Sequence, residues 1–209
     1  MKRAVMKRMT SPLWIAALTS VFSLAQAEPA KPAAIVASPA LKAGVLSPVM
    51  PAPALKLQGT DGKPVDLARF KGKVVLVAFG FSNCGEVCPI TLATLAGARK
   101  KLGAADAANV QVVYVTVDPE RDTEAQMKKY LASFDPTFIG GVGTRAQIDE
   151  AQKNWGISST KQTFADGGYS IGHSSSIYMI DRNGGLRAVM PYGHPSDDFV
   201  HDLRILLRS

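Results

Sequence analysis

Two short β-branched runs separated by a helix signal constrain the fold of this chain most strongly. The runs lie at residues 73–81 and 110–117, and turn residues bound each of them, as is typical of strands buried in a sheet. Between them, Pro89 suits the first turn of a helix, and Leu92 and Leu95 continue on one helical face. The pattern therefore predicts a β-α-β unit.

Three further helices are marked by residues that favour helix N-termini. Thr123 with Gln126, and Thr144 with Gln147, form capping-box patterns ahead of apolar residues at helical spacing. Ser196 is expected to cap a last helix. Acidic residues in the first turn of that helix and basic residues near its end suit the helix dipole.

The remaining strand signals complete a recognisable order. Residues 177–180 predict a third strand, residues 181–185 a hairpin turn, and residues 186–190 the partner strand. The full order is a hairpin or loop, β, α, β, α, a short α, β, β and α. This order predicts an α/β protein with the thioredoxin-like fold, in which helices flank a central mixed sheet. The chemistry of that fold is located where the first βα loop meets a helix N-terminus.

Only two cysteines occur in the chain, and Cys84 and Cys88 both fall in that loop. A structural disulfide at this spacing would close a very small loop and constrain the unfolded chain little, so we expect the pair to serve chemistry. The two sulfurs can form a redox disulfide or bind one soft metal ion. Three intervening residues, instead of the two of thioredoxin-type reductases, favour the metal. The helix N-terminus is expected to lower the thiol pKa values.

A metal site with two sulfurs needs at least one more ligand, and the chain has three histidines. His173 lies in a Gly/Ser-rich loop just before the strand at residues 177–180, where it can approach the cysteines. His194 is expected in a turn and His201 on the last helix, both at the surface. Two thiolates and one imidazole favour Cu(I), Cu(II) or Zn(II). No motif such as HExxH indicates a zinc hydrolase, so copper ranks above zinc.

The first 27 residues predict an export signal and not a part of the fold. Basic residues precede an apolar stretch at residues 12–24, and Ala-Gln-Ala at residues 25–27 is a small-x-small cleavage site. The apolar stretch is short against the ~20 residues of a membrane-spanning helix. An uncleaved anchor is the alternative. Both interpretations place the domain in the bacterial periplasm, with membrane contact only through the N-terminal segment.

Much of the basic excess of the chain lies in this segment. The chain has 24 basic and 17 acidic residues, and four of the basic ones precede residue 28, which leaves 20 against 17, or +3. So small an excess does not indicate a nucleic-acid partner. Residues 28–50 are rich in Pro and Ala and predict a flexible linker. Residues 51–209 are expected to form one thioredoxin-like domain, which we expect to be monomeric.

Four segments of this domain resemble the Sco/SenC/PrrC family. Residues 79–89, FGFSNCGEVCP, are similar to the CxxxCP signature of the family. Residues 115–123, 134–140 and 173–181 resemble its other motifs in the same order, the last with a histidine at its start. The resemblance covers about residues 52–208. It implies a thioredoxin-like, copper-binding protein that helps to assemble the CuA centre of cytochrome c oxidase.

The resemblance also implies a ligand set and a partner. Cys84, Cys88 and His173 would be the copper ligands, and the partner would be the copper subunit of cytochrome c oxidase or another exported copper protein. The chain departs from the family at Gly85, where the family usually has Pro, and at Gly172, where it usually has Asp. An acid beside the histidine could orient the imidazole or aid docking. The departure at Gly172 therefore bears on the delivery of copper to the oxidase more than on copper binding itself.

Two functions remain open from the sequence. The first is a metallochaperone that holds copper with Cys84, Cys88 and His173 and passes it on by ligand exchange. The second is an enzyme, a thiol–disulfide oxidoreductase that uses Cys84 and Cys88 to keep the copper-site cysteines of a partner reduced. A thiol peroxidase is disfavoured, because the Thr-x-x-Cys context is missing. His173 discriminates between the first two, since dithiol exchange does not require it.

Overall fold

The computed structural model describes residues 34–37 and 41–209. The predicted signal at residues 1–27 and part of the predicted linker, residues 28–33 and 38–40, lie outside the described residues. Within the described ranges, no helix is both long enough and apolar enough to cross a membrane.

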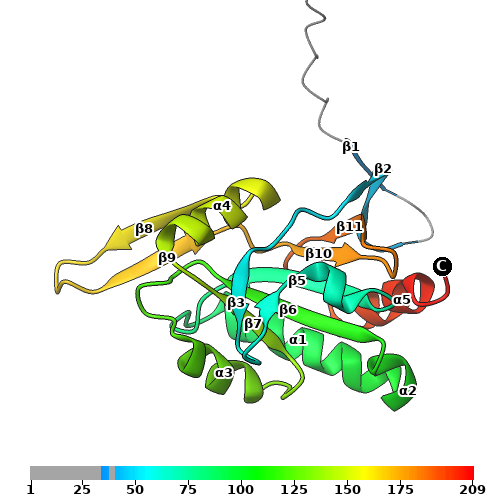
Figure 1. Cartoon of the computed structure of the whole chain (residues 1–209), viewed down its shortest axis with the longest axis horizontal. Coiled ribbons are helices and arrows are strands. Elements are labelled where there is room, and N and C mark those ends of the chain that lie inside the picture. The colour runs from blue at the N-terminus through cyan, green and yellow to red at the C-terminus, as the bar shows by residue number, and fades with distance from the viewer. Residues whose placement is uncertain (1–33, 38–40) are drawn as a thin grey trace, which may run out of the picture. The chain divides into compact units, whose positions relative to one another are not determined.

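A mixed sheet forms the centre of the structure (Figure 1), with the strand order β1-β2-β11-β10-β5-β6-β7-β3-β4. The three strands β5, β6 and β7 are parallel to one another, and the other pairings are antiparallel. A separate hairpin pairs β8 with β9. The strands are β1 (Ala34–Ala37), β2 (Gly44–Pro51), β3 (Leu57–Gly59), β4 (Pro64–Val65), β5 (Val74–Gly80), β6 (Val110–Thr116), β7 (Ile139–Val142), β8 (Ser159–Thr163), β9 (Tyr169–His173), β10 (Ile177–Ile180) and β11 (Gly185–Met190).

Helices cover both faces of this sheet (Figure 1). Helices α1 and α3 lie on one face, where α5 packs against α1, and α4 lies on the other. The predicted β-α-β unit is β5–α1–β6, and the α/β thioredoxin-like fold class is confirmed. The helices are η1 (Leu67–Phe70), α1 (Val87–Leu102), α2 (Ala104–Ala107), α3 (Glu124–Ala132), α4 (Arg145–Trp155) and α5 (Ser196–Leu206).

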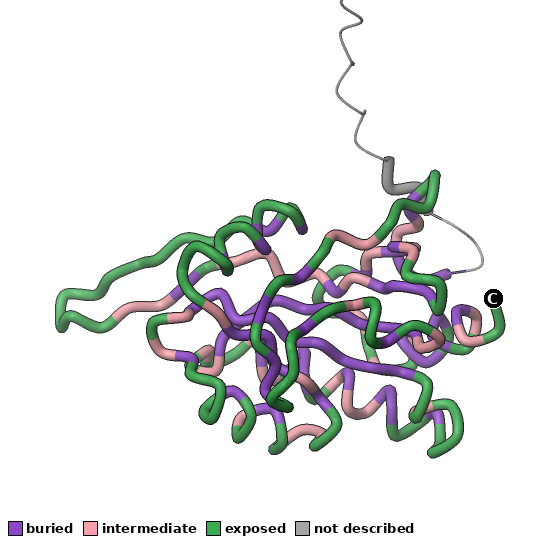
Figure 2. The backbone as a smooth tube through the Cα atoms, viewed as in Figure 1, coloured by how far each residue is buried: buried purple, intermediate pink, exposed green. Residues whose placement is uncertain are grey.

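The core is built around β5 and β6, in which every residue is buried (Figure 2). Helices on both faces exclude water from the two strands, which is why they appear in the sequence as continuous apolar runs. On the α4 face, the ring of Trp155 lies 6.0 Å from that of Phe79 and 5.2 Å from that of Tyr178, between centroids. This aromatic cluster attaches α4 to the sheet beside the end of β5.

The helix starts agree with the sequence in part. Thr144 and Gln147 form the full capping box of α4. Thr123 accepts a bond from the Gln126 amide at α3, but the Gln126 side chain donates to Ser82 and not to the cap. The prediction for Ser196 is wrong, because Pro195 is the N-cap of α5 and the Ser196 hydroxyl accepts a bond from Lys101 instead.

Residues 44–50, predicted as part of the linker, belong to strand β2 of the sheet, and residues 41–43 lead into it. Strand β2 pairs with β11, and Leu46 is buried. The carboxylate of Asp202 on α5 accepts bonds from the backbone amides of Lys42 and Ala43, each at 2.8 Å, and is itself fully buried. Pro/Ala-rich composition predicts a linker because it carries no strand periodicity, whereas the bonds that fix this segment come from residues 160 positions away.

The β8–β9 hairpin extends beyond the sheet and was not predicted. All five residues of β8 are exposed, so the segment has no apolar alternation that would indicate a strand (Figure 2). His173, which the sequence placed in a loop, is the last residue of β9.

Candidate metal centre

The cysteines lie where β5 ends and α1 begins. Cys88 is in the first turn of α1 and is only 2% exposed, whereas Cys84 lies in the preceding loop and is half-buried. Both are free thiols. The carboxylate of Asp122 holds the start of this loop, since it accepts bonds from the backbone amide and hydroxyl of Ser82. Asp122 also accepts a bond of 2.6 Å from Thr116, at the end of β6.

His173 meets Cys88 from the end of β9. Its Nε2 lies 3.7 Å from the Cys88 sulfur, and its Nδ1 lies 2.7 Å from the Ser174 carbonyl oxygen. A carbonyl can only accept, so Nδ1 carries the proton and Nε2 presents its lone pair to the sulfur. Burial lowers the pKa of His173 below its usual 6.5. At neutral pH the imidazole is therefore uncharged, which is the form that binds metals.

The environment of Cys88 favours the thiol over the thiolate. Burial, followed by the contact with Cys84, raises the pKa of Cys88 from 9.0 to about 12. The expectation that the helix N-terminus lowers this pKa is wrong for Cys88, because the cost of desolvating a charged sulfur is larger. Metal binding at Cys88 must therefore displace a proton.

The three predicted ligands are only partly brought together. Cys88 contacts both His173 and Cys84, but within the described part of the chain no three His, Cys, Asp or Glu side chains already form a metal-holding group. A Cβ at Gly85 would meet no atom within 4 Å, so there is open space beside the loop that carries Cys84.

Arg121 attaches the histidine hairpin to the rest of the domain. Its Nη1 donates to the Tyr169 carbonyl at 3.0 Å, and its guanidinium lies 3.7 Å from the Tyr169 ring centroid and 5.7 Å from that of Phe81. The carboxylate of Asp118 is fully buried and accepts bonds from Arg121 and from the Tyr169 hydroxyl. The Phe81 ring in turn meets the His173 ring edge-on, 5.9 Å between centroids.

These anchoring residues were largely missed from the sequence. From the sequence, Asp118 and Arg121 are recognised only within the motif at residues 115–123, and Tyr169 is given no role. The motif at residues 115–123 contains both Asp118 and Arg121 and was the available signal. Tyr169 lies in the unpredicted hairpin, so nothing in the local sequence paired it with them.

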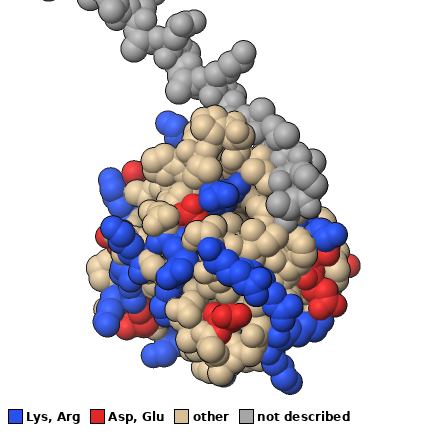
Figure 3. All heavy atoms as spheres, turned by 90° about the vertical axis from the view of Figure 1, so that its right-hand side faces the viewer, with Lys and Arg blue, Asp and Glu red and all other residues tan. Residues whose placement is uncertain are grey.

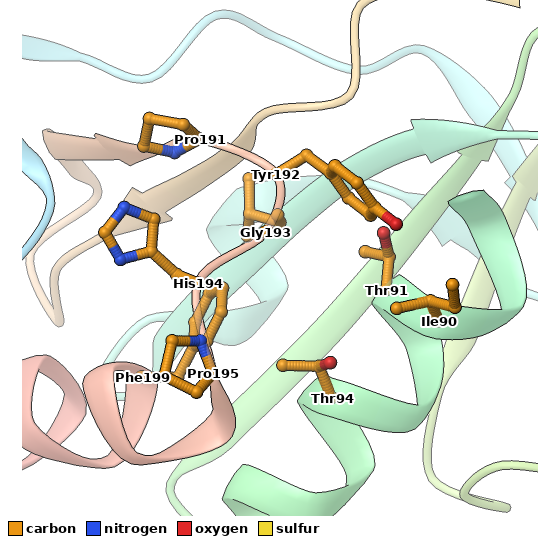
Figure 4. A pocket seen from close by; sticks show the side chains of 10 residues that line it. Ile90, Thr91, Thr94, Pro191, Tyr192, Gly193, His194, Pro195 and Phe199 are labelled. Carbon is orange, nitrogen blue, oxygen red and sulfur yellow. The ribbon is translucent and has the colours of Figure 1, made fainter.

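The other two histidines are separate from the cysteines. His194 lies in the turn before α5 and bonds Asp198 at 2.8 Å, and His201 is exposed on α5. A pocket of about 170 Å³ opens beside the turn and contains Ile90 and Thr91 of α1 (Figure 4). In this view the imidazole of His194 points away from those α1 side chains. Neither histidine lines the cavity between Cys88 and His173.

The fold and the site together define a thioredoxin-like protein with a dithiol in its first βα loop and a neutral histidine beside one thiol. The sequence model of the SCO1/SenC family matches residues 52–208, and the chain belongs to this family.

Relatives with known names agree with this assignment. A mitochondrial SCO2 homologue of Mus musculus is 38% identical over 145 residues, 68% of this chain and 57% of the relative. The copper-bound structure of ScoI from Bradyrhizobium japonicum is 33% identical, with a TM-score of 0.68 over 75% of this chain and 99% of that one. BsSco, described as having a disulfide switch and as a member of the Sco family of cytochrome c oxidase assembly proteins, is 28% identical, with a TM-score of 0.59 over 77% and 95%. The matches span 36% to 66% of the first three curated relatives' own lengths.

Proposed function

We propose that this protein is a copper metallochaperone that holds Cu(I) or Cu(II) with Cys84, Cys88 and His173. The observation that carries the proposal is the orientation of His173, whose Nε2 lone pair faces the Cys88 sulfur at 3.7 Å while Nδ1 is held by Ser174. A dithiol that only exchanged disulfides would not need this lone pair. The copper-bound relative from Bradyrhizobium japonicum supports copper as the cargo.

The donor set suits a metal that is bound and then released. Two thiolates favour Cu(I), and an imidazole extends the set toward Cu(II). Three protein ligands leave a coordination position for a donor of the recipient, so transfer can proceed by ligand exchange. Cys88 and His173 are the inner pair, and the half-exposed Cys84 is the ligand that a recipient can reach first.

The proposed recipient is the CuA centre of cytochrome c oxidase or another exported copper protein. The description of BsSco as a member of a cytochrome c oxidase assembly family supports this choice. The protein is proposed to act in the periplasm as a monomer, with membrane contact only through its N-terminal segment. The export signal predicted at residues 1–27 supports that location.

A thiol–disulfide oxidoreductase is the second candidate, and a specific observation favours it as well. Both cysteines are free thiols, where the first βα loop of a thioredoxin-like fold meets α1, and a disulfide switch is described for the relative BsSco. The two functions are compatible, because a dithiol must be reduced before it can bind copper.

Anaerobic titration of the reduced protein with Cu(I) and Cu(II), with zinc as competitor, tests the proposal. We expect a one-to-one complex with a sulfur-to-copper charge-transfer band. His173→Ala should abolish stable Cu(II) binding and weaken Cu(I) binding, since it removes the only nitrogen ligand. The His173→Ala variant should still be oxidised to the disulfide, because the two sulfurs are unchanged.

His201→Ala is the matched control, since His201 is exposed on α5 and should leave copper binding unchanged. An unchanged copper stoichiometry and spectrum in His173→Ala would refute the ligand assignment. A wild-type protein that retains no copper but forms a readily reducible disulfide would favour the oxidoreductase.

A further inference from the structure

The hydroxyl group of Tyr114 is deeply buried and lacks a regular hydrogen bond. It lies on β6 opposite Ala78 of β5, and its side chain is essentially inaccessible, at 1% exposure. The hydroxyl oxygen has no hydrogen-bond partner among the described residues. Buried hydroxyls in native proteins are usually satisfied, and those that are not require an explanation.

The hydroxyl shares a small space with the sulfur of Cys88. A Cβ built on Gly80 would lie 1.8 Å from the Tyr114 hydroxyl oxygen and 2.9 Å from the Cys88 sulfur. Both groups therefore converge on the space that Gly80, at the end of β5, leaves free. Any side chain at this position would displace one or both of them.

Water cannot satisfy the hydroxyl in this space. Tyr114, Cys88 and His173 line the same cavity, together with Ala78, Val87 and Thr91, and it has no room for a water molecule. The neighbouring sulfur is the polar atom toward which the hydroxyl is placed. A neutral thiol sulfur is a weak acceptor, whereas a thiolate accepts strong, charge-assisted hydrogen bonds.

We propose that Tyr114 is a positioning residue of the metal centre, whose hydroxyl donates a hydrogen bond to the Cys88 sulfur once that sulfur is a metal-bound thiolate. This inference rests on the proposed function, because it needs a metal that binds Cys88. In the metal-free protein the hydroxyl has only a neutral thiol beside it, which is a weak acceptor, and metal binding turns that sulfur into a strong one. The hydroxyl thus favours the loaded state and also reduces the electron donation of the sulfur to the metal.

Tyr114→Phe is the direct test, since it removes one oxygen and keeps the ring. Groups that bond to metal ligands typically contribute 10- to 100-fold to affinity, so we expect about tenfold weaker Cu(I) and Cu(II) binding. The sulfur-to-copper charge-transfer band should move to longer wavelength, because the sulfur electrons are no longer stabilised. The metal-free protein should unfold at the same or a higher denaturant concentration than the wild type.

Tyr130→Phe is the matched control. Tyr130 on α3 also has a buried hydroxyl without a partner, but it does not line the cavity of Cys88. This variant should show the same effect on metal-free stability and no effect on affinity or on the band. If the role of Tyr114 were purely structural, Tyr114→Phe would instead lower the stability of the metal-free protein and leave the charge-transfer band in place.

The outcomes separate this inference from the proposed function. If the wild type binds one copper and Tyr114→Phe has the same affinity and band, the role of Tyr114 is overturned and copper binding stands. If the wild type binds no copper, both the proposed function and the role of Tyr114 are refuted. A weaker affinity with a shifted band in Tyr114→Phe alone supports the inference.

Discussion

At the residue scale, three features of its surroundings determine the chemistry of the Cys88 sulfur. Burial in the first turn of α1 keeps it protonated, His173 presents a lone pair to it, and Tyr114 places a hydroxyl beside it. Gly80 makes this crowding possible, since it is the only residue type that leaves space for both the hydroxyl and the sulfur.

Gly80→Ala should therefore disturb the site directly. We expect a loss of about 1–3 kcal/mol in the free energy of unfolding, as is typical of overpacking in a tight core. Urea denaturation of the reduced, metal-free protein measures it. Gly85→Ala is the control, because a Cβ there meets nothing within 4 Å, and it should change stability by less than about 0.5 kcal/mol. Equal stability of Gly80→Ala and wild type would contradict the crowding described for Tyr114.

The site was predictable to different degrees at this scale. The spacing of Cys84 and Cys88 and their place after a buried strand were visible in the sequence, and the Gly/Ser-rich context of His173 together with the family motif identified the third candidate. Cys88 and His173 lie in contact, and the role of the three residues as metal ligands stays a prediction. Tyr114 could not be found, because a tyrosine within a buried apolar strand has the sequence pattern of any core aromatic residue.

At the scale of elements, the β8–β9 hairpin carries His173 on a mostly exposed arm. The hairpin has little apolar surface to bury, so its position depends on the polar and stacking contacts of Arg121 and Asp118 with Tyr169. These contacts fix the first residue of β9, beside the hairpin turn and four residues before His173. The position of His173, the proposed nitrogen ligand, is therefore set by a network of residues outside the proposed ligand set.

Arg121→Lys should loosen the hairpin while it keeps the charge. A lysine cannot reproduce the forked bonds or the stacking on Tyr169, so we expect about 1–2 kcal/mol lower stability and faster amide hydrogen exchange in β8 and β9. Arg145→Lys is the control, since Arg145 pairs with Glu120 at the exposed surface and should matter little. Unchanged exchange in β9 of Arg121→Lys would argue against this anchoring role.

The elements missed from the sequence have a common cause. Strand β2 and the hairpin strand β8 bury few side chains, so their sequences show no period of two. Their positions depend on distant partners, such as Asp202 for residues 42 and 43. Strand β5 was predicted because it is buried on both faces and appears as a continuous apolar run, and α1 and α5 were predicted because their buried faces leave a helical period in the sequence.

At the scale of the whole molecule, basic side chains gather on the end of the domain seen in Figure 3. Figure 3 shows Lys and Arg side chains gathered at the end that carries α2 and the last turn of α5, away from the hairpin. Lys100 and Lys101 in the last turn of α1 contribute exposed charges there. A helix rises 1.5 Å per residue, so these lysines lie about 18 Å along α1 from Cys88.

The stability of the reduced protein should fall in alkaline solution. Burial raises the pKa of Cys88 from 9.0 to about 12, so the folded protein keeps a proton that the unfolded chain releases. The contribution of this group is complete below pH 9 and is lost as the pH rises toward 12, at up to about 1.4 kcal/mol per pH unit. Urea denaturation with a reductant at several pH values between 8 and 11 measures the slope. Cys88→Ser should show a shallower slope, and an equal slope would contradict the assignment to Cys88.

The aromatic cluster beside β5 gives the protein an optical signal of its own. The chain has two tryptophans, Trp14 within the predicted signal and Trp155 in the cluster. Trp155 contacts Phe79, and Phe79 lines the cavity that Cys88 and His173 share. After removal of residues 1–27, all indole emission would come from Trp155, which is separated from the proposed copper site by the ring of Phe79. Loading and unloading could then be followed by intrinsic fluorescence, without a label and in real time.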